Sequence, residues 1–244
     1  MAGQQPLEEP EQPDEHHHRD LSGGGFRAAV FGLSDGLVTN VSLILGVAGA
    51  HPGGPFVRLA GVAGLVAGAF SMSAGEFVSV RAQSELMMRE LEVERSALRR
   101  WPKDERNELL AIYERRGIDR AVAEEMVDEV MSDPELALQT HAREELGFDP
   151  DATGSPVQAS ISSFFSFALG AVLPLIPWLV GSGTAATIGS VVIGLVTAAA
   201  VGWLLGHMTG RSRWRTALRQ VVVAAVAAGV TYGIGRAVGL GTGT

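Results

Sequence analysis

The stretch from Leu59 to Arg100 constrains the fold most, because it begins apolar and ends charged with no helix breaker between. Its first half carries one charge, Glu76, whereas its second half consists largely of charged residues and strong helix formers. Roughly forty helical residues extend about 60 Å, and a bilayer's hydrocarbon core takes up about 30 Å of that. We therefore predict a single helix that crosses a bilayer and continues into water.

Apolar segments of spanning length recur along the chain, and most of the charge lies outside them. This pattern predicts an all-α membrane protein with five transmembrane helices and a helical, cytoplasmic metal-binding insert between the second and third. The expected spans are 26–50, 57–80, 160–180, 186–208 and 218–240. The corresponding regions are a disordered tail (1–25), spans one and two (26–80), the insert (81–156), spans three to five (157–240) and a short C-terminal tail (241–244).

The acidity of the chain is local. Residues 81–149 hold eighteen Asp and Glu against eleven Lys and Arg, a net charge of −7 out of −8 for the whole chain. Such a segment attracts cations, and the chain shows no basic stripe with interleaved aromatic residues, so we expect no nucleic-acid partner. With no cysteine in the sequence, a metal site must use oxygen, imidazole or thioether ligands.

The N-terminal tail lacks the basic and apolar regions of a cleaved signal, so we expect the first apolar segment to remain in the mature protein. Its run from His16 to His18 is either a loose metal site or, as we favour, a solvated polar tract. Lys and Arg gather in the insert and, at positions 211, 213, 215 and 219, between spans four and five. The positive-inside rule therefore predicts a cytoplasmic N-terminus and a C-terminus on the opposite side.

The insert carries clear helix punctuation. Pro102 suits a first helical turn, Gly117 and Gly147 suit C-terminal stops, and Asp119 and Asp133 suit N-terminal caps. We predict about three short helices that pack on the long one through an apolar seam. The expected seam residues are Leu109, Leu110, Ile112, Val122, Met126, Val130, Leu136 and Leu138.

Glycine and proline mark the spans. Small-xxx-small pairs occur at 32 and 36, at 64 and 68, and at 202 and 206, and they favour close helix packing in a compact bundle or a dimer interface. Pro174 and Pro177 are expected to kink the third span and to leave backbone carbonyls unpaired. Those carbonyls would line a cavity, or the kink would be purely structural.

Two carboxylates lie at lipid depth, Asp35 in the first span and Glu76 in the second. An ionisable residue there costs about 2.5–3.5 kcal/mol and usually marks a transport path. Met72 lies four residues before Glu76, on the same helix face, and offers a soft sulfur ligand for a transition metal. The alternatives are an interfacial Asp35 bonded to Ser34 or Thr39, a boundary position for Glu76, and apolar filling for Met72.

Three pairs of possible ligands occur at helical spacing in the insert: Glu90 with Glu94, Glu105 with Glu108, and His141 with Glu145. If their faces converge, they offer several carboxylates and one imidazole, a set that suits Fe²⁺, Mn²⁺ or Zn²⁺. The alternative for any one pair is a solvated helix face.

Several segments together resemble the vacuolar iron transporter family over about residues 26–240: RAAVFGLSDGLVTNVSLILGVAGA, AGAFSMSAGEFVSV, the long helix, the acidic insert and VLPLIPW. The resemblance is to members without a ferritin-like domain. It implies a five-span homodimer that moves Fe²⁺, and often Mn²⁺, out of the cytosol in exchange for protons. It also implies that Asp35 and Met72 line the path, and that Glu94, Glu105, Glu108 and Glu145 bind metal.

The chain departs from the family pattern at three places. Ala97 stands where a second glutamate of the long helix is expected, which leaves Glu90 as its stand-in, and His141 with Ala142 replaces a pair of methionines. Gly64 stands where some members carry a carboxylate, a task that falls here to Glu76.

We therefore expect a transporter for divalent metal, not an enzyme, with no permanently bound cofactor and with Fe²⁺ or Mn²⁺ as substrate. Its partners would be metal ions, protons, the lipid bilayer and a second copy of the chain, and its place would be a bacterial plasma membrane. One alternative is a carboxylate-bridged metal oxidase, which needs paired Glu-x-x-His motifs that the chain does not contain. The other is a membrane-anchored binding or scaffold protein, which leaves Asp35 and Glu76 unexplained.

Overall fold

The structure is a computed structural model that describes residues 24–51, 53–151 and 154–241. All regular elements within these ranges are helices, and five of them are long and apolar enough to cross a membrane, as the sequence predicts. The predictions for the N-terminal tail with His16–His18, and for residues 242–244, fall outside the described residues. The spanning helices are α1 (Gly24–Gly49), α2 (Gly54–Arg100), α6 (Pro156–Val180), α7 (Gly183–Met208) and α8 (Arg213–Gly241).

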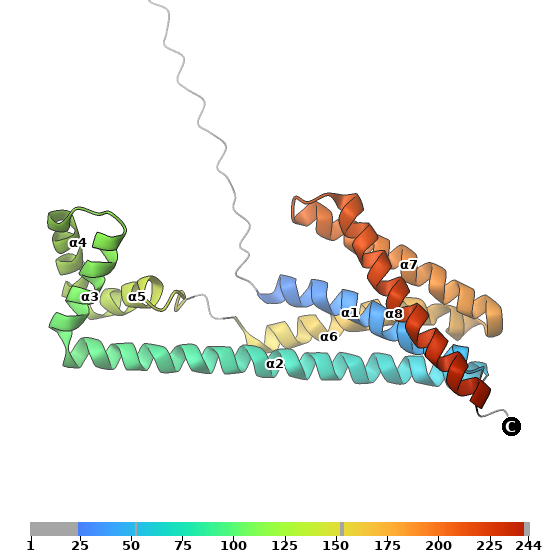
Figure 1. Cartoon of the computed structure of the whole chain (residues 1–244). Coiled ribbons are helices and arrows are strands. Elements are labelled where there is room, and N and C mark those ends of the chain that lie inside the picture. Colours follow the sequence, from blue (N-terminus) through green and yellow to red (C-terminus); the bar gives the residue numbers. More distant parts are fainter. Residues whose placement is uncertain (1–23, 52, 152–153, 242–244) are drawn as a thin grey trace, which may run out of the picture.

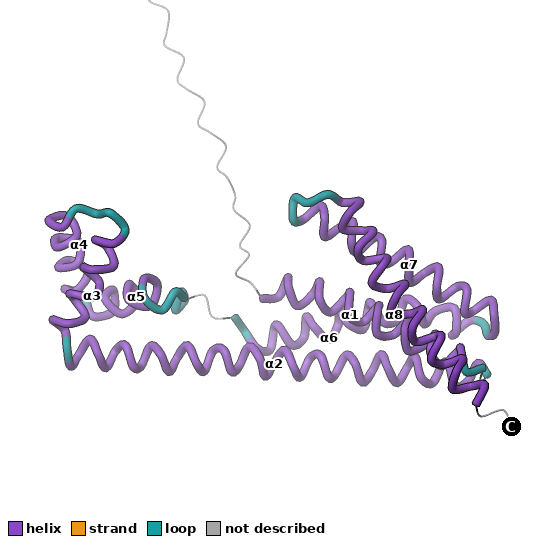
Figure 2. The backbone as a smooth tube through the Cα atoms, in the orientation of Figure 1, coloured by secondary structure: helices purple, strands orange, loops and turns teal. Residues whose placement is uncertain are grey.

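Helix α2 is the frame of the molecule (Figure 1). Its 47 residues form one uninterrupted helix of about 70 Å, which confirms the predicted rod. It begins with Pro55 in its first turn and ends at Arg100, because Trp101 leaves the helical conformation immediately before Pro102. The tube in Figure 2 shows that its two halves have different neighbours: other spanning helices lie along one side of one half, and the insert lies at the far end of the other.

Glycines bring the spanning helices together along α1, which packs against α6, α8, α2 and α7. A Cβ atom at Gly36 would overlap the backbone of Phe167 in α6, and one at Gly170 would overlap the backbone of Leu33. Likewise, Gly235 of α8 sits on the backbone of Gly46. The predicted pairs at 32 and 36 and at 202 and 206 therefore join helices within one protomer.

The prolines of α6 lie inside a continuous helix, and polar side chains from two neighbouring helices bond to the carbonyls around them. Asn40 of α1 donates through Nδ2 to the Ala171 carbonyl at 2.6 Å, and Ser190 of α7 donates to the Pro174 carbonyl at 2.6 Å. Both side chains are fully buried. These two hydrogen bonds tie α6 to α1 and α7 beside the prolines. The carbonyls that Pro174 and Pro177 deprive of a helical N–H are those of Gly170 and Leu173, so both alternatives for the proline pair stay predictions.

The insert contains three short helices, α3 (Pro102–Arg115), α4 (Arg120–Ser132) and α5 (Pro134–Glu144). The predicted punctuation is present: the side chains of Asp119 and Asp133 cap α4 and α5, and Gly117 and Gly147 adopt positive φ after α3 and α5. An ion pair from Arg106 to Asp128, at 2.6 Å, joins α3 to α4.

The apolar seam of the insert is partly in a different register from the prediction. Leu109, Leu110, Ile112 and Leu138 are buried, but Val122, Met126 and Leu136 are exposed. Helix α4 instead packs through Ala123 and Val127 against Leu109, Leu110 and Tyr113. Hydrophobicity alone favours the larger side chains of α4 as core residues. The close approach of α3 instead buries the face of α4 that lies one residue further along the chain.

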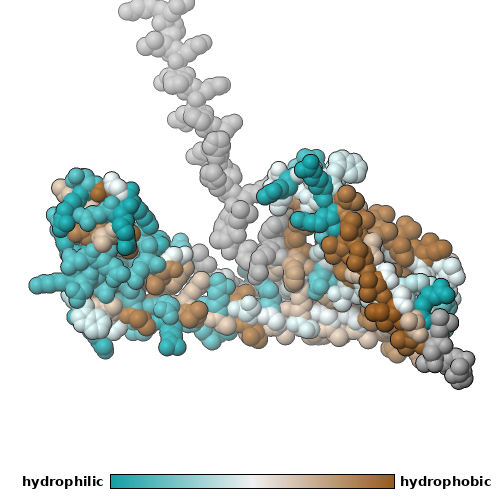
Figure 3. Space-filling model, in the orientation of Figure 1, coloured by the Kyte–Doolittle hydropathy of each residue, from teal (hydrophilic) through white to brown (hydrophobic). Residues whose placement is uncertain are grey.

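The ends of the spanning helices fall on two sides of the bundle (Figure 1). The starts of α1 and α6 and the turn between α7 and α8 lie toward the insert, and the end of α8 lies on the far side. The space-filling view shows hydrophilic residues over the insert and at the α7–α8 turn, and a hydrophobic surface along α8 (Figure 3). This two-sided arrangement is the one that an odd number of spans requires.

Candidate metal site

A carboxylate is buried where α2 meets the insert. Beyond residue 80, the one buried position among the described residues of α2 is Glu94, with 6% of its surface exposed. It packs against α5, whose face toward α2 carries the fully buried His141. Burying ionisable groups is costly unless they are paired or bind a cation, so this contact is a candidate functional site.

Four of the six predicted ligands converge here, from α2, α3 and the end of α5. One ligand atom from each of Glu94, Glu105, His141 and Glu145 lies within 4.8 Å of the others. We call these four residues the acidic cluster. The Nδ1 atom of His141 lies 3.2 Å from Glu94 Oε1, 3.5 Å from Glu145 Oε2 and 3.9 Å from Glu105 Oε2.

Not all of the polar atoms in the acidic cluster are satisfied within the described residues. Glu94 Oε1 and His141 Nε2 are buried without a hydrogen-bond partner there. The short Glu94–His141 distance is thus an electrostatic contact with poor hydrogen-bond geometry, whereas Nδ1 does make a hydrogen bond with Glu145. Open ligand atoms around a shared centre are what a cation site needs.

The electrostatics of the acidic cluster favour the uptake of a cation. Burial and, after it, the negative charges of Glu145, Glu105 and Glu108 together raise the pKa of Glu94 to about 7. Burial also raises the pKa of Glu105, although a protonated His141 opposes this shift. With no Lys or Arg ion pair to these carboxylates in the described part of the chain, a proton or a metal ion must supply the positive charge.

The remaining two predicted ligands lie beside the acidic cluster, not within it. Glu108 is exposed on α3, one turn after Glu105, and it acts on the pKa of Glu94 through its charge. Glu90 is half-buried on α2, one turn before Glu94. The paired spacing identified the correct helices, and the packing of α5 on α2 brings Glu94 into the group and leaves Glu90 outside.

The predicted path residues lie in the membrane bundle on two different helices. Asp35 is half-buried on α1 and accepts a hydrogen bond from Thr39 at 3.2 Å, the contact that its structural alternative requires. Met72 of α2 is half-buried and packs against Ala69, Phe167 and Ala171, as the filler alternative requires. Glu76 is half-buried one turn further along α2. A path role for these residues stays a prediction.

Asn40 is a polar residue at lipid depth that the sequence reasoning missed. Its amide nitrogen bonds to α6, but its Oδ1 atom is buried without a partner in the described part of the chain. The signal was available in the sequence, since a lone Asn in an apolar span is expected to bond across helices. Asn40 carries no charge, so a prediction from ionisable residues alone does not include it.

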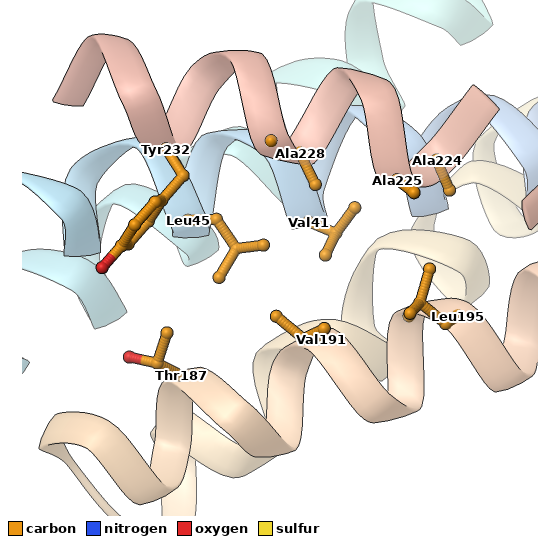
Figure 4. Close-up of a pocket in the computed structure, with 11 residues that line it drawn as sticks. Val41, Leu45, Thr187, Val191, Leu195, Ala224, Ala225, Ala228 and Tyr232 are labelled. Carbon is orange, nitrogen blue, oxygen red and sulfur yellow. The ribbon is translucent and has the colours of Figure 1, made fainter. Parts of the chain in front are cut away.

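An apolar cavity of about 270 Å³ lies between α1, α7 and α8 (Figure 4). Val41, Leu45, Val191 and Leu195 line it, together with small residues of α8, and the hydroxyls of Thr187 and Tyr232 are at one end. It contains no carboxylate or imidazole. Such a lining does not hold a divalent cation, so the cavity is separate from any metal path.

The fold and the acidic cluster define a class: an α-helical membrane protein in which one long helix, apolar in its first half, carries part of a cluster of carboxylate and imidazole side chains in its charged half. Comparison with known families identifies the particular one. The model of the VIT family matches residues 26–236, so the chain belongs to the VIT family.

Proteins called vacuolar iron transporters are similar to this chain over most of its length. Vacuolar iron transporter 1 of Arabidopsis thaliana is 29% identical over 206 residues, which cover 84% of this chain and 82% of that protein. The vacuolar iron transporter of Acanthamoeba castellanii is 36% identical over 165 residues, covering 67% of this chain and 59% of that protein. That of Toxoplasma gondii is 29% identical, with 82% and 70% covered. The family and its relatives define a metal transporter.

Proposed function

We propose that this protein exports Fe²⁺, and secondarily Mn²⁺, from the cytoplasm in exchange for protons. The observation that carries the proposal is the convergence of Glu94, Glu105, His141 and Glu145 at the far end of a spanning helix. The names of the relatives, vacuolar iron transporters, support iron as the substrate.

The acidic cluster captures metal on the cytoplasmic side. Three carboxylates and one imidazole suit Fe²⁺, Mn²⁺ and Zn²⁺. Because Glu94 has its pKa raised to about 7, metal competes there with a proton in the physiological range. The cluster therefore loads metal when the cytoplasm is neutral and releases it as protons arrive.

Asp35, Met72 and Glu76 form the path through the membrane in this proposal. A carboxylate in a low-dielectric path stabilises either a metal cation or a proton, and this alternation provides the basis of exchange. Asp35 supplies charge on α1, and Met72 and Glu76 supply a sulfur and a second carboxylate on one face of α2. The glutamate lies between Met72 and the acidic cluster along the helix, so it provides an intermediate position.

Two copies of the chain form the transporter in this proposal. Within one protomer the spanning part of α2 and the whole of α8 are little buried, with large apolar side chains such as Phe70 and Val226 exposed. These surfaces face lipid or a second copy. The arginines of the α7–α8 turn and the insert place both in the cytoplasm by the positive-inside rule, and the C-terminus opposite.

We place the protein in a bacterial plasma membrane. The relatives' names give the vacuole as their location. In either membrane the proposed orientation moves metal out of the cytosol, so the direction of transport does not depend on the compartment.

The test is metal flux into proteoliposomes with and without an imposed pH gradient. Fe²⁺, Mn²⁺, Co²⁺ and Zn²⁺ are compared, and proton movement is followed with an internal pH dye. We expect Fe²⁺ and Mn²⁺ uptake that accelerates when protons can leave the lumen, together with alkalinisation of the lumen. Metal uptake without any proton movement would remove exchange from the proposal, and no uptake of any of the four ions would overturn transport itself.

A further inference from the structure

The turn between α7 and α8 forms an open, basic pocket that the metal path does not use. Its volume is about 580 Å³, and its charged lining consists of Arg211, Arg215 and Arg219. All three side chains are exposed, and no ion pair involves them within the described part of the chain. Arg215 and Arg219 are four apart on α8, so they present like charges on one face. Among the described residues, no carboxylate forms an ion pair with these three arginines.

The backbone holds this pocket in shape. Gly206 of α7 lies so close to α8 that a Cβ atom there would meet the backbone of Arg213, and Gly202 lies equally close to Ala217. The turn is further tied by a hydrogen bond from Arg211 N to the Gly206 carbonyl at 3.0 Å. Because the helices cannot approach further, the pocket is a built concavity and not a gap between loose side chains.

Two aromatic side chains mark this turn as a point where lipid meets water. Trp203 of α7 and Trp214 of α8 pack edge to face with ring centroids 5.0 Å apart, and the guanidinium of Arg213 lies 5.9 Å from the centre of the Trp203 ring. Tryptophan gathers at the headgroup level of a bilayer, where it has both an apolar and a polar neighbour. The basic pocket therefore lies at headgroup depth.

An apolar surface begins next to the pocket. Leu218, Val222, Val226 and Val230 are exposed along α8, and the hydrophobic surface in Figure 3 runs from the hydrophilic turn down this helix. A phosphate in the arginine pocket with acyl chains along α8 would satisfy both surfaces. Free phosphate or an acidic peptide would satisfy the charges alone.

We propose that this pocket binds the phosphate headgroup of an anionic phospholipid. Arginine presents several N–H donors in a planar fork that matches phosphate oxygens, and three such forks converge here. The hydroxyls of Thr209 and Thr216 already donate to helix carbonyls, so the guanidiniums are the donors toward the lipid. Basic pockets between spanning helices on the cytoplasmic side commonly hold such headgroups.

The test uses the full-length protein in detergent, titrated with phosphatidylglycerol or phosphatidylcholine of identical acyl chains and read by native mass spectrometry. We expect the wild type to retain phosphatidylglycerol selectively. The variant R211Q/R215Q/R219Q should lose on the order of 100-fold in affinity for it, and each single variant roughly fivefold. The single variants keep the test valid if the triple variant folds poorly.

A matched control removes the same charge elsewhere. Arg89, Arg100 and Arg115 are exposed on α2 and α3, away from the pocket, and R89Q/R100Q/R115Q should leave phospholipid affinity unchanged. Equal losses in the two triple variants would reduce the effect to net charge and overturn the proposal. So would equal binding of phosphatidylcholine, or unchanged affinity in all three single variants.

Competition with inorganic phosphate distinguishes a lipid headgroup from a free phosphate, which offer the arginines the same oxygens. Acyl contacts along α8 should make the lipid bind far more tightly, so millimolar phosphate should leave bound phosphatidylglycerol in place. Displacement of the lipid by phosphate at that concentration would show that the pocket recognises a soluble anion, and the lipid assignment would fail.

Discussion

The two halves of α2 bury different kinds of side chain, apolar in one half and ionisable in the other, although they belong to one continuous helix. In the bilayer half the buried positions are Val57, Gly61 and Ala69, which let neighbouring helices approach closely. In the outer half the buried position is the carboxylate of Glu94. In lipid the helix gains stability from close van der Waals packing. In water a buried carboxylate is tolerated where a cation or a proton compensates the cost of burying its charge. One helix thus joins a half that packs through small residues to a half that buries a carboxylate.

The largest expected effect concerns Asp35, a carboxylate that α1 contributes to the membrane bundle beside the packing half of α2. Asp35→Asn removes a charge at nearly constant volume. Without this carboxylate a cation at lipid depth lacks a compensating negative charge, so Fe²⁺ flux in proteoliposomes should fall on the order of 100-fold. The unfolding midpoint in detergent should stay near that of the wild type. The control Glu125→Gln, on the exposed face of α4, should transport normally. Normal flux in Asp35→Asn would remove this residue from the path.

The second effect disrupts the close helix packing of the membrane bundle. Gly36→Ala places a methyl group against the backbone of Phe167, and such overpacking costs about 1–3 kcal/mol. Gly75→Ala, on α2, meets no atom within 4 Å and should gain helix propensity instead. Thermal unfolding in one detergent compares the two variants. If Gly36→Ala unfolds no earlier than Gly75→Ala, then the close contact between α1 and α6 does not determine stability.

The third effect removes a ligand from the acidic cluster. Glu94→Gln should weaken Mn²⁺ binding by about 10–100-fold in isothermal titration of the full chain. The same change one turn earlier, Glu90→Gln, lies outside the cluster and should weaken binding little. This pair of variants separates a specific site from a diffuse acidic surface. Equal losses that vanish at high salt would assign both residues to the surface.

The fourth effect is the pH dependence of the same site. Because the pKa of Glu94 is raised from 4.5 to about 7, its contribution to stability is full below 4.5 and is lost as pH rises through about 7. Metal binding has the opposite dependence, since it requires the deprotonated form, and Mn²⁺ affinity should be at least about tenfold higher at pH 7.5 than at pH 5.5. The metal-free insert should therefore unfold more easily at pH 8, and saturating Mn²⁺ should reverse that change. Affinity that does not depend on pH would contradict the raised pKa.

The smallest expected effect sharpens the role of Met72. Met72→Leu keeps the apolar bulk that packs against Phe167 and removes the sulfur, so the stability change should stay below about 1.5 kcal/mol. We expect iron flux to fall clearly while the unfolding midpoint changes little. Leu65→Met serves as a control for a methionine elsewhere in the same helix. Unchanged iron flux in Met72→Leu would return this residue to a packing role alone.

The sequence by itself determined the elements, because the signals for them are local. Hydropathy over a single segment predicted all five spans, and the absence of a breaker between Leu59 and Arg100 predicted the continuous rod. The caps at Asp119 and Asp133 and the glycine stops at 117 and 147 depend on neighbours a few residues away, and all four are present. The candidate ligands of the insert were likewise visible as pairs at helical spacing.

Only the tertiary structure decided which faces meet. The direction of a helix face changes by about 100° per residue, so a small rotation of α4 exposes Val122 and buries Ala123. The same geometry places Glu94 in the acidic cluster and leaves Glu90 outside. Contacts between residues far apart in the chain set these rotations, such as those that bring α5 against α2 and Gly36 against Phe167. A periodic pattern proposes several faces, and long-range packing selects one of them.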